Sequence, residues 1–165
     1  MKVIITELRY NNIRDFRDFR IKLSAEGSSA PHISLIQMPN GTGKTTTISL
    51  IRYALFGKSW DLPREVREFE PQSFKAEKGQ FEMLYLVNNE KHSIKLEFNY
   101  EPGIAKYSTS SPTSGGYETG HNLPRQIRSL MTEEFTKLFI FDGELANDLF
   151  NSQKTKAEGA IRSVF

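Results

Sequence analysis

Cysteine is absent from this chain of 165 residues. Without cysteine the chain can form neither disulfides nor thiolate metal sites, which fits a reducing, intracellular compartment. The N-terminal segment also has no long apolar stretch, because it alternates apolar and polar side chains and carries charges early. This pattern predicts neither a secretory signal nor a membrane anchor. We therefore expect a soluble, cytoplasmic protein without a membrane partner.

A strong excess of one charge is missing too, because 22 basic side chains are balanced by 20 acidic ones. The overall charge therefore gives no field strong enough to indicate nucleic-acid or membrane binding, and any DNA contact has to come from a local patch. One basic cluster lies near the N-terminus among aromatic residues. It could hold phosphates, but such a cluster is more often the solvated face of a hairpin. The cluster consists of Arg9, Arg14, Arg17, Arg20 and Lys22.

A chain of this length fits one domain with its own core, and its apolar pattern predicts two hairpins. Residues 1–23 alternate like two strands around a charged turn at 11–18, and residues 80–100 alternate around a polar turn at 88–91. The segment 103–121 is rich in Ser, Thr and Gly and too polar to build core. We expect a mobile loop or a frayed hairpin there.

Helical structure is expected in three further segments. The charged segment 58–78 should be a surface excursion with one helical turn at most. Asn122 is a suitable N-cap for a helix that has Pro124 in its first turn and runs towards Phe135. A last helical stretch is expected over residues 144–165.

The chemistry lies where a short apolar run at 32–38 leads into the glycine-rich loop 39–47 and then into a helical pattern that stops at Gly57. Buried strand, loop and helix in this order indicate a P-loop, in which backbone N–H groups and a lysine bind phosphates and a hydroxyl binds Mg²⁺. Met38 stands where the motif normally has its first glycine, which affects only the tightness of the loop's first turn. We predict a site for ATP and Mg²⁺. The backbone N–H groups that curl around the phosphates belong to Asn40, Gly41, Thr42 and Gly43. Lys44 binds the phosphates, Thr45 binds the metal, and Thr46 makes a further phosphate contact.

Residues 39–46 read PNGTGKTT, and the helix after them ends in ALFG at 54–57. Both resemble the ATPase heads of the SMC-like family, in which a PNGxGKTT loop precedes a helix ending in an ALYG-like tetrapeptide. Residues 12–16 (NIRDF) are similar to the N-F-R-x-F element of those heads, and this resemblance places the basic Arg14 near the nucleotide. Residues 135–145 (FTKLFIFDGEL) resemble an element of the DndD-type ATPases of DNA phosphorothioation and defence systems.

The resemblance implies an α/β fold, namely the P-loop-containing N-terminal lobe of an ABC-type head with mixed and antiparallel strands around the P-loop helix. Within such a head, Asp142 takes the place of the Q-loop glutamine, and a carboxylate could keep its role at Mg²⁺. Lys44 and Asp142 would then be the catalytic residues, with Thr45 and Asp142 as metal ligands.

Two other interpretations of Asp142 stay open. Asp142 and Gly143 could simply form a tight turn after a strand. Residues 138–142 also have the form of a Walker B strand, which would make the chain a self-contained P-loop kinase or NTPase. Against this interpretation, the sequence shows no later lid or base-recognition element, and its two carboxylates are not adjacent as they are in ABC-type Walker B strands.

A serine-glycine signature loop, a Walker B strand with its catalytic glutamate and a histidine switch are not found, although an ABC-type head needs all three. In SMC-like proteins they lie beyond a long coiled coil. The resemblance therefore implies that residues 1–150 form the N-terminal lobe and that residues 151–165 start a helix leading to a missing coiled coil. The implied partners are the C-terminal half of the same head, a second head in a homodimer, and DNA bound by the complete assembly.

Four functions follow from these alternatives. The leading one is an ATPase head that drives DNA repair, modification or phage defence. The second is a self-contained P-loop kinase or NTPase, which turnover by this chain alone would distinguish. The third is a binding module in which ATP only gates assembly, with dimerisation that does not need hydrolysis. An ABC transporter head is weaker, because nothing in the sequence indicates a membrane partner.

Overall fold

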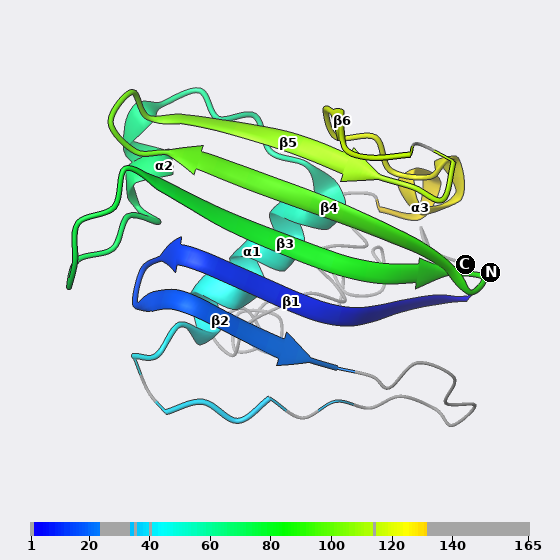
Figure 1. Cartoon of the computed structure of the whole chain (residues 1–165), viewed down its shortest axis with the longest axis horizontal. Coiled ribbons are helices and arrows are strands. Elements are labelled where there is room, and N and C mark those ends of the chain that lie inside the picture. The colour runs from blue at the N-terminus through cyan, green and yellow to red at the C-terminus, as the bar shows by residue number, and fades with distance from the viewer. Residues whose placement is uncertain (1, 24–33, 35, 40, 114, 132–165) are drawn as a thin grey trace, which may run out of the picture.

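One antiparallel sheet carries most of the described chain (Figure 1). The computed structural model describes residues 2–23, 34, 36–39, 41–113 and 115–131. Six strands follow the order β2-β1-β3-β4-β5-β6, and every neighbouring pair is antiparallel. The strands are β1 (Val3–Ile13), β2 (Phe16–Lys22), β3 (Lys78–Val87), β4 (Glu90–Asn99), β5 (Ile104–Ser110) and β6 (Glu118–Thr119). The helices of the described part are α1 (Lys44–Phe56), α2 (Pro63–Arg67) and α3 (Arg125–Leu130).

The sheet agrees with the predicted antiparallel strands but not with the predicted mixture. Within the described part of the chain no two strands run parallel, and the described residues of the expected buried strand at 32–38 form no strand. Ser34 and Ile36 are exposed instead. A parallel strand is buried by neighbours on both faces, and no described strand pairs with this segment.

Two tight turns close the predicted hairpins with fewer residues than expected. The β1–β2 turn consists of Arg14 and Asp15 alone, and Arg14 has a φ of 51°. The β3–β4 turn consists of Asn88 and Asn89, with φ values of 49° and 72°. Two-residue hairpin turns need such positive φ angles because they match the twist of the strands, and asparagine tolerates them better than most residues.

The core lies between α1 and one face of the sheet. Alternate side chains of β1, β3 and β4 point towards α1, which Figure 1 shows crossing behind the strands. α1 ends as predicted at Gly57, whose N–H donates to the carbonyl of Tyr53 at 2.9 Å. The fully or almost fully buried side chains of this layer include Leu8, Tyr10, Leu50, Ala54, Phe81, Met83, Ile94 and Leu96.

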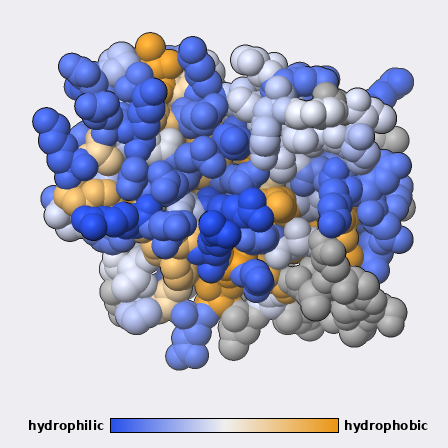
Figure 2. Space-filling view, in the orientation of Figure 1, coloured by the Kyte–Doolittle hydropathy of each residue, from blue (hydrophilic) through white to orange (hydrophobic). Residues whose placement is uncertain are grey.

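The opposite face of the sheet is polar, and Figure 2 shows it as largely hydrophilic in the same orientation. Around β1, β3 and β4 its side chains are paired with one another. The Arg9 guanidinium lies 2.9 Å from a Glu7 oxygen and 3.3 Å from a Glu82 oxygen. The Tyr117 hydroxyl also donates to Glu82, and the Lys95 ammonium lies 4.0 Å from the Tyr117 ring centroid. Glu82 is therefore buried without being left unpaired.

Strand β5 corrects the expectation of a mobile loop at 103–121, and its short antiparallel pairing with β6 agrees with the alternative of a frayed hairpin. It pairs with β4 along its whole length, and β6 adds a short further strand beside it. The Tyr107 hydroxyl donates to the carbonyl of Tyr53 at 3.2 Å and accepts the N–H of Lys58 at 3.1 Å. The polar composition concealed the strand because Thr109 and Tyr107 alternate towards the core as apolar residues would.

The segment 58–78 contains the single helical turn that was expected, as α2, but it is not a surface excursion. Val66 is fully buried, and the ring of Phe69 stacks on Phe98 with centroids 5.0 Å apart. Aromatic residues separated by charged ones carry no clear period, so the sequence did not indicate that this segment covers one end of the core.

Helix α3 begins at Arg125 with Pro124 as its N-cap, so the predicted cap at Asn122 is two residues too early. Its Ile127 is fully buried. The predicted continuation to Phe135 and the helix predicted over 144–165 lie outside the described residues. Among the helices that the structure describes, none has the length and apolar character needed to cross a bilayer.

Candidate functional site

A pocket of about 480 Å³ opens where the glycine loop meets the β1–β2 turn. Three segments that are distant in the sequence line it. The hairpin contributes Arg14 and Asp15 of the turn and Phe16 of β2. The loop and the first turn of α1 contribute residues 41–46, and the segment after α2 contributes Gln72. All the predicted loop residues that the structure describes therefore lie around one pocket, together with Arg14.

Glycine is required at two positions of this loop by the backbone. Gly41 has a φ of 80° and Gly43, the N-cap of α1, has a φ of 100°, and residues with a Cβ rarely adopt either value. At Gly43 the surroundings add a second requirement, because a Cβ would lie 2.6 Å from the Phe16 ring. The hairpin therefore packs directly onto the loop where α1 begins.

The ammonium group of Lys44 lies against the start of the same loop. It donates to the carbonyl oxygens of Met38 at 3.0 Å and Pro39 at 2.9 Å. The Thr42 hydroxyl also donates to Pro39, at 2.7 Å. Met38, which replaces the usual first glycine, thus takes part through its backbone, and the loop curls tightly without that glycine.

The electrostatics of the pocket suit an anion. Lys44 opens α1, and no acidic side chain lies in the first turn of that helix. The N-terminus of a helix carries a partial positive charge and N–H groups without intrahelical partners. Arg14 adds a second cation, and Asp15 is the sole carboxylate among the described lining residues. The exposed Thr45 and half-exposed Thr46 hydroxyls complete a donor set that fits a phosphate chain with a divalent cation.

A buried hydrogen bond fixes the hairpin to the helix behind the loop. The Tyr10 hydroxyl, in β1, donates to the Thr47 hydroxyl in α1 at 3.2 Å. Burial raises the pKa of Tyr10 to about 12, so the phenol stays protonated at neutral pH. The Tyr10 ring also packs on Phe16, with centroids 4.8 Å apart. Sequence analysis assigned no role to Thr47, because its contact is made by a residue far away in the chain.

Sequence analysis assigned no site role to three lining residues, Asp15, Phe16 and Gln72, and Gln72 is the one distant from every predicted site residue in the sequence. It follows α2 in the segment that was expected to be a surface excursion. No local pattern could have identified it, since its position depends on the fold of the whole segment. Its exposed amide offers both a donor and an acceptor beside Arg14 and Asp15.

Two predicted site residues, Asn40 and Asp142, lie outside the described residues. Their roles stay predictions, and so do the competing interpretations of Asp142. Within the part of the chain that the structure describes, no three acidic or histidine side chains come together as metal ligands.

The basic cluster of the hairpin is divided among different surroundings. Arg14 lies at the glycine-loop pocket, Arg9 is paired with carboxylates, and the Arg17 guanidinium lies 4.6 Å from the Phe74 ring centroid. The Arg9 hydrogen bond lowers the pKa of Glu7. Arg20 and Lys22 are exposed on β2, where they are the register partners of Arg9 and Glu7. Arg9, Arg20 and Lys22 therefore lie near one another on the hairpin, whereas Arg14 and Arg17 have other surroundings.

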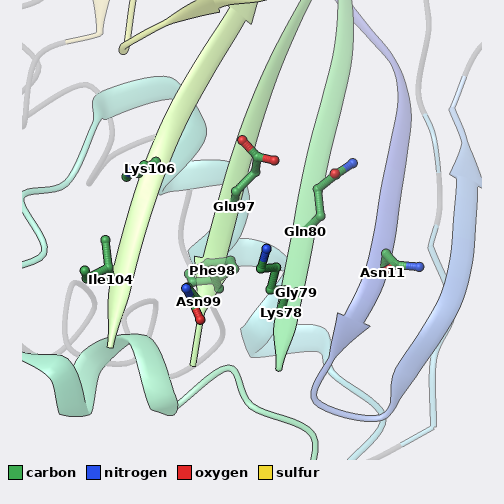
Figure 3. Close-up of a pocket in the computed structure, with 9 residues that line it drawn as sticks. All are labelled: Asn11, Lys78, Gly79, Gln80, Glu97, Phe98, Asn99, Ile104 and Lys106. Atoms are coloured by element: carbon green, nitrogen blue, oxygen red, sulfur yellow. The ribbon is translucent and has the colours of Figure 1, made fainter. Parts of the chain in front are cut away.

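A second hollow, of about 340 Å³, lies on the polar face of the sheet and is shown in Figure 3. Four of its side chains form a row across neighbouring strands, since each is the register partner of the next: Asn11, Gln80, Glu97 and Lys106. Lys78, Asn99 and Ile104 flank the row. This hollow contains none of the predicted site residues.

Comparison with known proteins agrees with the glycine-loop geometry. The model of the AAA domain family matches residues 7–160. This chain belongs to the AAA domain family. Membership of the AAA domain family implies ATP binding, and the glycine loop is the element that would bind the phosphates.

The AAA domain is also distantly similar to part of a nuclease. The SbcC component of the nuclease SbcCD from Staphylococcus aureus strains JH9, Newman and JH1 is 26% identical over 174 residues. The alignment covers 96% of this chain but 17% of each relative. The AAA domain therefore corresponds to a small portion of much longer proteins.

Proposed function

We propose that this chain is the ATP-binding N-terminal part of an ABC-type, SMC-like ATPase head that acts on DNA. The observation that carries the proposal is the glycine-loop pocket, in which the start of α1, Lys44 and Arg14 of the β1–β2 turn face one space. Membership of the AAA domain family and the similarity to a nuclease component support it.

The predicted site residues each have a definite task in this proposal. Lys44 binds the β- and γ-phosphate oxygens, and the backbone of residues 40–43 holds the phosphate chain. The Thr45 hydroxyl binds Mg²⁺, which when present neutralises charge on the phosphates. Thr46 adds a phosphate contact, and Arg14 provides a second cation beside the nucleotide. Asp142 is proposed as the further carboxylate that orders the metal.

The head is proposed to be complete only with further parts. Residues 1–150 would form its N-terminal lobe, and 151–165 would begin a helix leading to a coiled coil. The chain spans 17% of the length of its curated relatives, which is consistent with an ATPase that needs further parts. The C-terminal half and a second head would supply the signature loop, the Walker B carboxylates and the histidine switch.

DNA is proposed as the substrate of the assembly, in repair, modification or phage defence. The name of the similar protein, part of a nuclease, supports a nucleic-acid substrate. On this chain the exposed Arg20 and Lys22 of β2 are the basic side chains of the hairpin best available to a phosphate backbone. A specific kinship with DndD-type ATPases stays a prediction based on residues 135–145.

The test measures Mg-ATP binding and ATP hydrolysis by the chain alone and then with the C-terminal half added. We expect binding without turnover until the second half is present. Lys44→Ala should weaken binding about 100-fold, because it removes a charge-assisted contact to the phosphates. Lys106→Ala, which removes an exposed lysine from the polar face of the sheet, is the matched control and should leave binding unchanged.

Two outcomes would contradict the proposal. Equal binding by the Lys44→Ala variant and the unmodified chain would show that the glycine loop is not the phosphate site. Steady, Lys44-dependent turnover by the chain alone would instead support the self-contained kinase or NTPase.

A further inference from the structure

The hydroxyl of Tyr100 connects two segments that line the glycine-loop pocket, although Tyr100 itself does not line it. Its oxygen lies 2.6 Å from the carbonyl of Asn12 in β1 and 3.1 Å from the carbonyl of Phe69 after α2. The side chain is buried, with 2% of its surface exposed. Burial raises the pKa of Tyr100 well above its usual value, so the phenol remains a donor at physiological pH.

The same Phe69 carbonyl also holds the turn that carries Arg14. The backbone N–H of Arg14 donates to it at 2.9 Å. Phe69 is three residues before Gln72, so one short segment contacts Tyr100, Arg14 and the pocket. The β1–β2 turn and the segment 69–72 are thereby joined beside the glycine loop.

The backbone of the turn needs such support. Asn12 and Arg14 have φ values of 50° and 51°, which are unfavourable for residues with a side chain and persist where surrounding contacts hold them. Tyr100 bonds the carbonyl of the first, and Phe69 bonds the N–H of the second. These two hydrogen bonds therefore support the backbone at and next to the turn.

Gly79 of β3 provides the space in which the hydroxyl lies. A Cβ at this position would lie 2.0 Å from the Tyr100 hydroxyl and 2.6 Å from the Asn12 carbonyl. Any side chain here would therefore displace one of the two partners. The absence of a side chain at 79 is required by the hydrogen bond and not by the backbone angle, since Gly79 does not have a positive φ.

We propose that Tyr100 is a positioning residue of the nucleotide site, whose hydroxyl holds the β1–β2 turn so that Arg14 faces the phosphates bound at the glycine loop. The inference rests on the proposed function, because it takes Mg-ATP as the ligand of the pocket. It assigns to Tyr100 and Gly79 a contribution to nucleotide affinity that is exerted through Arg14.

The first experiment replaces only the hydroxyl, with Tyr100→Phe in the full-length protein. The dissociation constant for Mg-ATP is measured by titration with a fluorescent ATP analogue, and the thermal midpoint is recorded beside it. We expect binding to weaken about threefold to tenfold, the effect of one net hydrogen bond. Tyr85→Phe is the matched control, because Tyr85 is equally buried but forms no hydrogen bond with the described residues of the turn. It should leave the dissociation constant unchanged.

A double-mutant cycle separates positioning from a general loss of stability. If Tyr100 acts through Arg14, adding Tyr100→Phe to Arg14→Ala should weaken binding no further than Arg14→Ala alone. Gly79→Ala gives an independent route, since its Cβ displaces the hydroxyl, and its binding loss should likewise vanish when Arg14 is already replaced.

Failure of this inference is distinguishable from failure of the proposed function. Unchanged affinity in Tyr100→Phe, or losses that add to those of Arg14→Ala, would overturn the role of Tyr100 while Lys44-dependent binding persists. If the unmodified protein binds Mg-ATP no better than Lys44→Ala, the proposed function itself fails and the positioning role fails with it.

Discussion

The glycine-loop pocket and the hollow on the polar face of the sheet are built in different ways. The first brings together the β1–β2 turn, the loop before α1 and Gln72, and it includes three residues with positive φ: Arg14, Gly41 and Gly43. The second is formed by side chains such as Gln80 and Glu97, which stand opposite one another on neighbouring strands in regular register.

The difference shows how a functional pocket can be told from a hollow that any sheet presents. Side chains in register lie side by side wherever strands pair, so the hollow of Figure 3 requires no contact beyond the sheet itself. The glycine-loop pocket instead contains Arg14 with a positive φ, and long-range contacts made by Tyr10, Phe16 and Tyr100 connect the segments around it. Such conformations persist where surrounding structure supports them, and they gather at functional sites.

Among the changes that test this difference between the two pockets, Gly43→Ala should lower the free energy of unfolding the most. The new Cβ combines an unfavourable φ of 100° with a contact of 2.6 Å to Phe16, so we expect a loss of about 3 kcal/mol in the free energy of unfolding. Gly115→Ala is the control for the backbone angle alone, because its φ of 63° is also positive but nothing lies within 4 Å of its Cβ. It should cost about 1 kcal/mol. Equal losses in urea unfolding would show that Phe16 yields easily and that the hairpin is not fixed to the loop.

Tyr10→Phe should have a smaller effect, confined to the glycine-loop side of the molecule. It removes the hydroxyl that bonds Thr47 and leaves that buried threonine without its partner, which should cost about 1 kcal/mol in the free energy of unfolding. Gln80→Ala in the sheet hollow should change it by less than about 0.5 kcal/mol. Both free energies of unfolding are measured with urea. A larger loss of stability for Gln80→Ala than for Tyr10→Phe would contradict the idea that the glycine-loop pocket depends on long-range contacts and the sheet hollow does not.

The smallest expected effect is a pH dependence at the end of α1 away from both pockets. A ring nitrogen of His121 lies 2.8 Å from the carbonyl of Ala54, and burial lowers the pKa of His121 below its usual value of 6.5. The unfolded chain therefore takes up the proton first as the pH falls. Stability contributed by the neutral ring is present above 6.5 and is lost as the pH drops below it, by less than about 1 kcal/mol.

His121→Gln tests this dependence by removing the titrating ring. The free energy of unfolding, measured by urea at several pH values, should fall less steeply for the variant than for the unmodified chain just below pH 6.5. Identical slopes would contradict the lowered pKa. His92, whose pKa burial also lowers, is present in both proteins and cancels from the difference.

Local patterns predicted the helix and loop of the site, while long-range contacts stayed beyond sequence analysis. The glycine loop, the helix after it and the end of that helix at Gly57 follow from neighbouring residues, so the sequence indicated them correctly. Arg14 was placed near the loop only by resemblance. Gln72 and Tyr100 could not be found, because their relation to the loop depends on how β3, β4 and the segment after α2 pack together.

Composition misled where polar residues form regular structure. The Ser and Thr content of 103–121 predicted a mobile loop or a frayed hairpin, yet β5 pairs with β4 along its whole length and Tyr107 connects it to α1. The opposite error occurred at 32–38, where apolar character indicated a buried strand but the described residues pair with no described strand. A strand requires a partner, and partners are not visible in a single segment.

The contact between Lys2 and the β3–β4 turn has a practical consequence for labelling. The N–H of Lys2 donates to the Asn88 side chain at 3.1 Å, and the Asn88 N–H donates to the Lys2 carbonyl at 2.9 Å. These two hydrogen bonds hold the start of β1 at the end of the sheet opposite the β1–β2 turn (Figure 1). At about 3.4 Å per residue, β1 separates the two ends by about 35 Å. A fluorophore or affinity tag attached ahead of Lys2 would therefore emerge far from the glycine loop and leave nucleotide access unobstructed.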